Sequence, residues 1–193
     1  MKASIIKYNA GNVQSVLFAL ERIGINAIVT DDFDLLRSSD KIILPGVGEA
    51  SSAMNYLKEK KLDQLIISLT QPVLGICLGM QLMCQYSEEG NTNCLGIFDN
   101  KVRRFSKGVK APKMGWNTIY DLKTDLYKHV QENEYMYFVH SYYAALGEYT
   151  IATANYEIEY SASLQKNNFY GTQFHPEKSG DAGQRILENF IKL

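Results

Sequence analysis

The sequence has few of the features that mark membrane, secreted or nucleic-acid-binding proteins. No apolar run approaches the roughly 20 residues of a membrane-spanning helix, and residues 1–7 lack the apolar core of a signal peptide. The 20 basic and 21 acidic residues leave a net charge of −1. Such a small charge offers no attraction for nucleic acid or an anionic membrane. We therefore expect neither as a partner.

Cysteine and histidine are also scarce, with three of each. An odd number of cysteines without a secretion signal argues against a disulfide framework and favours a reducing compartment, so we expect a cytoplasmic protein. Cys77, Cys84 and Cys94 are not spaced like zinc ligands, and no paired histidines lie near them. We expect no metal site and no cofactor. Cys84 falls on the apolar side of an expected helix and is interpreted as a core residue.

Apolar residues make up 46% of the 193-residue chain, enough for a substantial core in one domain of ordinary size, 1–193. In the first half, runs rich in β-formers alternate with helical patterns. This alternation is typical of an α/β fold with a mostly parallel central sheet flanked by helices. The expected strands are 3–6, 26–29, 41–44 and 72–76, and the expected helices are 13–23, 50–58, 62–70 and 80–86.

After residue 90 the sequence changes to short aromatic segments. We expect strands there, arranged in hairpins or as a mixed and antiparallel extension of the sheet. A closing helix is expected over 181–192, and no internal repeat or low-complexity linker divides the chain. The expected strands are 96–104, 114–119, 135–144, 149–156, 160–165 and 169–174.

The most informative segment is Gly75-Ile76-Cys77-Leu78-Gly79-Met80-Gln81, which follows an apolar run. A strand, a tight turn and a helix, with a thiol at the turn, is an arrangement that exposes a nucleophile. The flanking glycines keep neighbouring side chains away, and the start of a helix favours a thiolate. Taken alone, the pattern also fits a small buried cysteine, because cysteine often packs as an apolar residue.

A nucleophilic cysteine also needs a base. His175 follows an expected strand, is restrained by Pro176, and has Glu177 two residues on, close enough to hydrogen-bond one ring nitrogen. A neutral imidazole can take a proton and return it to a leaving amine. We interpret His129, in a surface turn, and His140, within an apolar strand, as structural residues.

The third requirement is a set of donors for the oxyanion that develops during the reaction. Pro45-Gly46-Val47-Gly48 follows an expected strand, so a freed N–H of Val47 or Gly48 can face the reacting carbonyl. The N–H of Leu78, next after Cys77, is the natural second donor. The alternative is an ordinary strand-to-helix turn, which Pro and Gly mark in any protein.

Together these segments resemble the class I, or triad, glutamine amidotransferases, through residues 75–81 and Gln173-Phe174-His175-Pro176-Glu177. The resemblance implies that a cysteine attacks the side-chain amide of L-glutamine. A γ-glutamyl thioester then forms, ammonia leaves, and water regenerates the enzyme. The resemblance makes Cys77 the nucleophile, His175 the base and then the acid, and Glu177 the orienting carboxylate, with Leu78 and Gly48 as oxyanion donors.

A closer resemblance extends from the first expected strand to the last helix. Residues 8–16, 44–48, 112–117, 138–142 and 175–179 are similar to the glutaminase subunits of imidazole glycerol phosphate synthase. This likeness implies a heterodimer with a (β/α)₈-barrel synthase (cyclase) subunit. The barrel uses the ammonia to form imidazole glycerol phosphate and aminoimidazole carboxamide ribotide in histidine biosynthesis. At the subunit interface the likeness places Asn12, Met114, Trp116, Tyr137 and Lys178.

The same resemblance implies residues that hold the α-amino-acid end of glutamine. From the residues alone, Glu89 also fits a solvated helix end, and Trp116 also fits a core position. The first loop reads Lys7-Tyr8-Asn9-Ala10, whereas many members have Asp-Tyr-Gly there. The implied glutamine-binding residues are Gln81 and Glu89, with the backbone of Ser141 and Tyr142.

Three other interpretations stay open at this point. The chain could serve another ammonia-using synthase, such as one making anthranilate or pyridoxal phosphate, although 112–117 and 140–142 argue against it. It could be a binding or regulatory module without catalysis, which the intact Cys77, His175 and Glu177 disfavour. It could also be a general cysteine hydrolase that acts on other small amides or esters.

Overall fold

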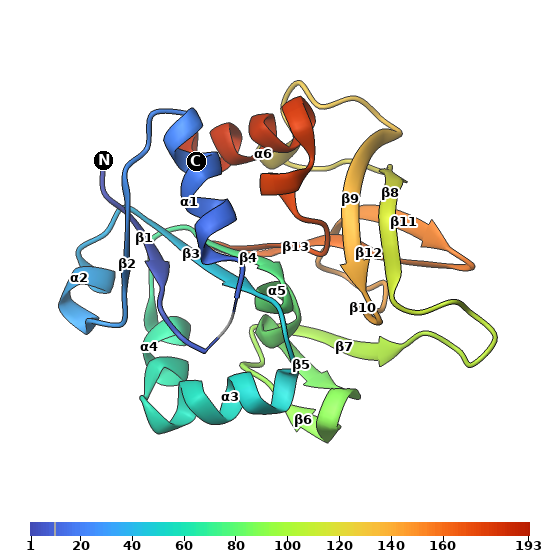
Figure 1. The fold of residues 1–193 in the computed structure, drawn as a ribbon, viewed down its shortest axis with the longest axis horizontal. Helices are drawn as coiled ribbons and strands as arrows, with labels where there is room; N and C mark the ends of the chain where they lie inside the picture. Colours follow the sequence, from blue (N-terminus) through green and yellow to red (C-terminus); the bar gives the residue numbers. More distant parts are fainter. Residues whose placement is uncertain (10) are drawn as a thin grey trace.

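The computed structural model describes residues 1–9 and 11–193, so Ala10 in the first loop lies outside the described residues. A twisted sheet runs through the centre of the molecule, with helices on both of its faces (Figure 1). The helices are α1 (Val13–Arg22), α2 (Phe33–Arg37), α3 (Ala50–Glu59), α4 (Leu62–Ser68), α5 (Leu78–Met83) and α6 (Gly180–Lys192). Short 3₁₀ turns are η1 (Glu89–Asn91), η2 (Asp125–Tyr127) and η3 (Pro176–Lys178).

The central sheet has the strand order β11-β12-β13-β4-β3-β1-β2. Strands β2, β1, β3, β4 and β13 run parallel, and β12 and β11 extend the sheet in antiparallel pairs. This arrangement confirms the expected α/β class with a mostly parallel sheet. Its strands are β1 (Ala3–Ile6), β2 (Ala27–Thr30), β3 (Lys41–Gly46), β4 (Val73–Cys77), β11 (Thr150–Tyr156), β12 (Ile158–Lys166) and β13 (Phe169–Thr172).

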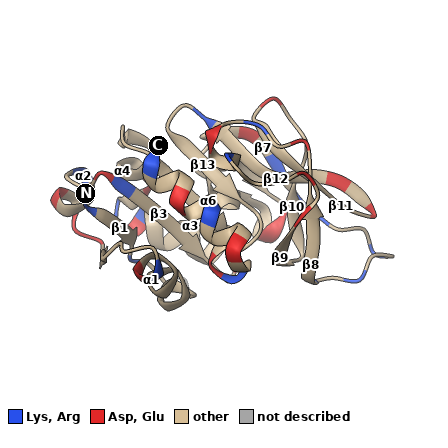
Figure 2. Cartoon of the chain, turned by 90° about the horizontal axis from the view of Figure 1, so that it is seen from above, with Lys and Arg blue, Asp and Glu red and all other residues tan. Residues whose placement is uncertain are grey.

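The two faces of the sheet bury separate hydrophobic clusters, because successive strand residues point to opposite faces. Ile5 and Ile43 pack with α1 and α6 on one face. Ile6 and Ile42 pack with α3, α4 and α5 on the other face. Helices therefore cover both sides, and the parallel strands read as continuous apolar runs. Charged side chains are spread along the outer helices and loops and are sparse on the central strands (Figure 2).

Two smaller sheets pack beside the antiparallel end of the central sheet. One has the strand order β10-β7-β5-β6, and the other is the β8–β9 ribbon. They are the mixed extension expected from the aromatic half of the sequence. The strands are β5 (Cys84–Ser87), β6 (Thr92–Asn93), β7 (Phe98–Arg104), β8 (Lys113–Ile119), β9 (Glu134–His140) and β10 (Tyr142–Ala144).

The structure corrects two expected elements and adds a helix that was not expected. The helix expected over 80–86 ends at Met83, and Cys84 starts strand β5. All six residues of α5 are buried, and a segment buried on every side does not distinguish helix from strand by periodicity. Cys84 is a core residue, as expected, but it lies in a strand. The strand expected over 135–144 is interrupted at Ser141, and the short helix α2 was not predicted.

Other expected elements occur in place with ends shifted by a few residues, as is usual for boundaries. Among the described residues, no helix is long and apolar enough to cross a membrane.

Candidate active site

Cys77 lies where β4 meets α5, with φ 54° and ψ −109°. Non-glycine residues rarely adopt a positive φ, and here it turns the thiol out of the sheet between strand and helix. Gly79 makes this junction possible, since a Cβ atom there would lie 1.8 Å from the Leu44 carbonyl oxygen. Only glycine lets α5 approach β3 this closely. The expected strand–turn–helix around a thiol is therefore present.

The Cys77 sulfur has two polar neighbours. The Val139 carbonyl oxygen lies 3.7 Å from Sγ and accepts from the thiol. The side-chain amide Nε2 of Gln173 lies 3.6 Å from Sγ and donates to it. Val139 lies on β9, and Gln173 directly follows β13, so both are distant from Cys77 in sequence. Cys77 itself is only 6% exposed.

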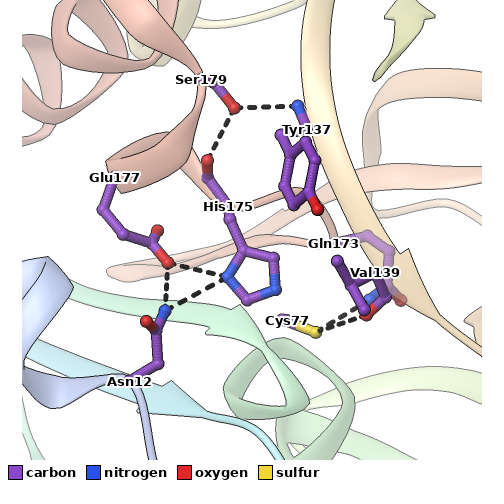
Figure 3. A network of polar contacts seen from close by, with 8 residues as sticks. All are labelled: Asn12, Cys77, Tyr137, Val139, Gln173, His175, Glu177 and Ser179. Atoms are coloured by element: carbon purple, nitrogen blue, oxygen red, sulfur yellow. Dashed lines mark hydrogen bonds and ion pairs between the residues drawn. The ribbon is translucent and has the colours of Figure 1, made fainter. Parts of the chain in front are cut away.

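His175 is fixed by contacts on both its ring and its backbone (Figure 3). Nδ1 lies 2.7 Å from the Glu177 carboxylate oxygen Oε1. The backbone N–H of His175 donates to Tyr137 at 2.9 Å, and its carbonyl accepts from the Ser179 hydroxyl at 2.6 Å. The second ring nitrogen faces the side of the site where Cys77 lies (Figure 3). The structure thus brings the three expected triad residues together.

The surroundings of His175 favour its protonated form. Burial opposes the positive charge, but hydrogen bonding and charge attraction from Cys77 and Glu177 outweigh it and raise the pKa of His175 to about 10. A nearby anion favours a cation in this way. Contacts with Cys77 and Glu177 therefore favour the imidazolium form of His175. It can donate a proton first and act as a base afterwards.

Asn12 contributes to this network, although the family resemblance implied only an interface role for it. Its side-chain amide donates to Glu177 Oε1 and lies 3.4 Å from His175 Nδ1. It is half-buried at the start of α1. An amide donor shared with the carboxylate helps to hold Glu177 against the imidazole ring.

A pocket of about 240 Å³ opens beside Cys77. Every residue expected for the oxyanion donors and the glutamine-binding end lies in its wall, although they come from four separate segments. As the first residue of α5, Leu78 has no intrahelical acceptor for its N–H. Gly48 has a φ of 122°, which favours glycine. The pocket is lined by Cys77 with Val47, Gly48, Leu78, Gln81, Glu89, Ser141 and Tyr142, and also by Pro112, Val139 and His140.

Two of these residues are tied into the protein. Gln81 is buried, and its Nε2 donates to the Tyr142 carbonyl at 2.9 Å and to Gln173 Oε1 at 2.8 Å. Glu89 Oε2 accepts from the backbone N–H of Ala50, at the start of α3, at 2.8 Å. Burial raises the pKa of Glu89, and that N–H partly opposes the rise. Glu89 is therefore neither a freely solvated residue nor remote from the nucleophile.

His140 is a structural residue, as expected. Its Nδ1 donates to the Tyr142 carbonyl at 2.8 Å, since a carbonyl can only accept, and the Tyr160 hydroxyl approaches Nε2 at 3.4 Å. Burial lowers the pKa of His140 to about 4. It is therefore neutral and holds the strand break at Ser141. His129 lies in an exposed turn, as expected.

The residues expected at a subunit interface mostly lie on one surface. Met114 and Trp116 on β8 are 63% and 52% exposed, so the alternative of a core tryptophan is wrong. Tyr137 pairs with Trp116 across the β8–β9 ribbon, with the ring centroids 5.9 Å apart. Lys178 is exposed next to the triad. Asn12, as described above, faces Glu177.

Sequence reasoning gave no role to three residues that the structure places beside the triad. Gln173 and Ser179 lie within four residues of His175, and this proximity in sequence was the available indication. Val139 lies within the segment 138–142, but its backbone carbonyl contact with Cys77 depends only on tertiary packing. Among the described residues, no cluster of His, Cys, Asp and Glu has a geometry that could hold a metal ion.

Comparison with known proteins agrees with this geometry. The glutamine amidotransferase class-I family matches residues 5–193, and the chain belongs to that family. Within this class it groups with the HisH subunits of imidazole glycerol phosphate synthase. The subunit of Bacteroides fragilis is 57% identical, covering 100% of both chains. The Haemophilus influenzae subunit is 46% identical, covering 98% of this chain and 96% of the relative.

A solved structure supports the fold alone. PurLQS from Thermotoga maritima superposes with a TM-score of 0.74 at 16% identity, covering 99% of this chain and 97% of that chain. The expected family is thus confirmed by full-length relatives, and the expected architecture by a distant structure.

Proposed function

We propose that Cys77, His175 and Glu177 catalyse the hydrolysis of L-glutamine to glutamate and ammonia. The observation that carries this proposal is the imidazole held at 2.7 Å by Glu177, with its other nitrogen facing the thiol beside a pocket. With the proton of the Cys77 thiol held on His175 as the imidazolium, the thiolate attacks the amide carbon, and His175 then gives that proton to the departing nitrogen. Ammonia leaves a γ-glutamyl thioester. The neutral imidazole then takes a proton from the attacking water.

The tetrahedral intermediates carry a negative oxygen that needs donors. We assign this role to the N–H of Leu78 and an N–H of Val47 or Gly48, all in the pocket wall beside Cys77. Loss of one such donor typically costs roughly 3–4 kcal/mol of transition-state stabilisation. Because Gly48 can change its backbone angles readily, this segment can turn its N–H inward or outward.

The amino-acid end of glutamine has complementary groups in the same pocket. The carboxylate of Glu89 suits its ammonium group, and the side chain of Gln81 with the backbone at Ser141 and Tyr142 supplies neutral polar contacts. These groups lie in the same wall as the sulfur and favour glutamine over small amides that lack the charged end.

The ammonia is passed to a partner, which we propose to be a (β/α)₈-barrel synthase subunit in a heterodimer. The partner would form imidazole glycerol phosphate in histidine biosynthesis, as the names of the HisH relatives indicate. The exposed aromatic surface of β8 and β9 supports this proposal, because large exposed apolar groups mark interaction sites. We place the chain in the cytoplasm, where its three free cysteines would stay reduced.

The test is glutamate release from glutamine by the purified chain alone, with the barrel subunit, and with that subunit plus its nucleotide ligand. We expect weak activity alone and strong stimulation only in the last condition, because the partner shifts the oxyanion segment inward. Full activity alone, unaffected by partner or ligand, would contradict this gating. Stimulation by an unrelated synthase instead would change the assigned pathway.

Cys77→Ala separates chemistry from structure in the same complex. We expect loss of glutamine-dependent synthesis with ammonia-dependent synthesis intact, because the variant lacks only the nucleophile. Cys84→Ala is the matched control, since that thiol is buried in the core away from the pocket. Loss of both activities in Cys77→Ala would mean that Cys77 has a structural role.

A further inference from the structure

Gln173 is brought next to the nucleophile by the register of the sheet. Thr172 on β13 pairs with Ile76 on the parallel strand β4. The following residues, Gln173 and Cys77, therefore emerge side by side at the carboxyl ends of these strands. Gln173 is 0% exposed, and a buried amide must find partners for both its oxygen and its NH₂ group.

The orientation of the Gln173 amide follows from a chain of hydrogen bonds that begins at a backbone oxygen. The Tyr142 carbonyl can only accept, so the Gln81 atom at 2.9 Å must be its NH₂ group. The same NH₂ group lies 2.8 Å from Gln173, which must therefore present its oxygen there. The NH₂ group of Gln173 is left to face the Cys77 sulfur at 3.6 Å.

The two polar neighbours of the sulfur favour different protonation states. A thiol can donate to the Val139 carbonyl, but a thiolate gains nothing from that oxygen. The Gln173 NH₂ group offers a donor, and donors to an anion are stronger than donors to a neutral sulfur. Removal of the thiol proton thus shifts the favourable contact from Val139 to Gln173.

We propose that Gln173 is a positioning residue that stabilises the Cys77 thiolate and aims it at the pocket, with Gln81 fixing the Gln173 amide. This inference rests on the proposed nucleophilic role of Cys77 and adds a group outside the triad. It also gives Gln81 a second task besides lining the pocket, because Gln81 holds Gln173 in the donating orientation.

The test is the rate at which iodoacetamide alkylates Cys77, followed by mass spectrometry of the Cys77 peptide from about pH 5 to about pH 10. We expect Gln173→Met to slow alkylation at neutral pH about tenfold and to move the rate-versus-pH curve about one unit higher. Gln165→Met is the matched control. That glutamine lies on β12 and donates to Tyr170 at 3.2 Å, so its variant should keep the wild-type curve.

Gln173→Glu provides a second, nearly isosteric variant if Gln173→Met fails to fold. It places an acceptor where the donor stood, so the curve should move at least as far upward. A folded variant of either kind with the wild-type curve would overturn the inference. Its steady-state signature is a lower kcat with little change in KM for glutamine.

The outcome is independent of the substrate assignment, because iodoacetamide alkylation requires no glutamine. A shifted curve in a protein without glutaminase activity would keep this inference and reject the proposed function. If the Gln173 variants keep the wild-type curve while the wild-type protein is an active glutaminase, the proposed function stands and this inference is rejected.

Discussion

Single residues in this site are held by neighbours that lie far away in the sequence. Glu177 is two residues from His175, but it also accepts from Asn12 at the start of α1. The Cys77 sulfur contacts Val139 on β9 and Gln173, which directly follows β13. The chemistry of each side chain therefore depends on contacts that the triad motifs do not contain.

Glu177→Gln should shift the alkaline limit of glutamine hydrolysis. The carboxylate helps to raise the pKa of His175 to about 10, so the imidazolium that protonates the leaving nitrogen persists to high pH. With a neutral amide at position 177 the pKa of His175 falls, so the alkaline decline of kcat should begin at a lower pH than in the wild type. The maximal kcat should also fall by about 10²-fold or more. The measurement is kcat against pH in the complete complex. Glu148→Gln, at an exposed position, is the control. If kcat falls at the same alkaline pH in Glu177→Gln as in the wild type, Glu177 is not part of the triad.

His140 should make the protein less stable in acid. Its pKa is about 4 in the folded protein, against an ordinary value of 6.5. Between these two pH values, His140 binds a proton in the unfolded chain but not in the folded protein. The free energy of unfolding therefore decreases as the pH falls through this window. His140→Gln should remove up to about 1.4 kcal/mol of this loss per pH unit. Urea unfolding at several pH values measures it.

The exposed His129 provides the control for that experiment. His129→Gln makes the same substitution at an exposed position and removes no buried side chain. A wild-type slope in His140→Gln would show that other groups cause the acid sensitivity.

At the scale of elements, the junction between β4 and α5 determines where the thiol lies. The helix rests directly on β3, because position 79 has no side chain. The same junction gives Cys77 its positive φ, so packing of backbone on backbone supports the strained turn. The break between β9 and β10 is the matching feature across the pocket, where it presents Ser141 and Tyr142.

Gly79→Ala should disturb both folding and chemistry. The added methyl group would lie 1.8 Å from the Leu44 carbonyl oxygen, so α5 must move away from β3. Overpacking of this kind costs roughly 1–3 kcal/mol or more, and alkylation of Cys77 should slow as the turn shifts. Thermal unfolding measures the first effect. Gly108→Ala, where nothing lies within 4 Å of the new Cβ, should behave as wild type; equal stability of both variants would contradict this account.

At the scale of the whole molecule, the site opens next to an exposed aromatic surface. Tyr137 contacts Trp116 on that surface and accepts a hydrogen bond from the backbone of His175. A partner that covers Trp116 therefore contacts the β8–β9 ribbon, and β9 accepts a hydrogen bond from His175 of the triad. This continuity gives a physical route by which a bound subunit could influence glutamine hydrolysis.

Trp116→Ala should weaken assembly without unfolding the chain. The ring is 52% exposed, so its removal leaves the core intact, whereas a central aromatic anchor is worth about 2 kcal/mol or more at an interface. We expect the Kd for the barrel subunit to rise about 30-fold or more. Isothermal calorimetry measures it. Phe18→Ala removes another exposed aromatic ring, on α1, and should bind normally; equal Kd values in both variants would place the interface elsewhere.

The sequence by itself determined the class of fold and the three triad candidates. Alternating apolar runs and helical patterns are local properties, and the motifs around Cys77 and His175 are contiguous. The helix expected over 80–86 exists but ends at Met83, because α5 is buried on every side, which removes the periodicity that would show where the helix ends. The single strand expected over 135–144 was wrong because the break at Ser141 depends on the neutral His140 beneath it.

Only the tertiary structure decided how these residues act together. The sheet register placed Gln173 beside Cys77. Tertiary packing brought the Asn12 amide into a hydrogen bond with Glu177 and left Trp116 exposed. The raised pKa of His175 also depends on Cys77, which the fold brings to it from the end of another strand. Electrostatic and hydrogen-bonding effects depend on distances in space, and a sequence pattern carries such distances only for residues a few positions apart.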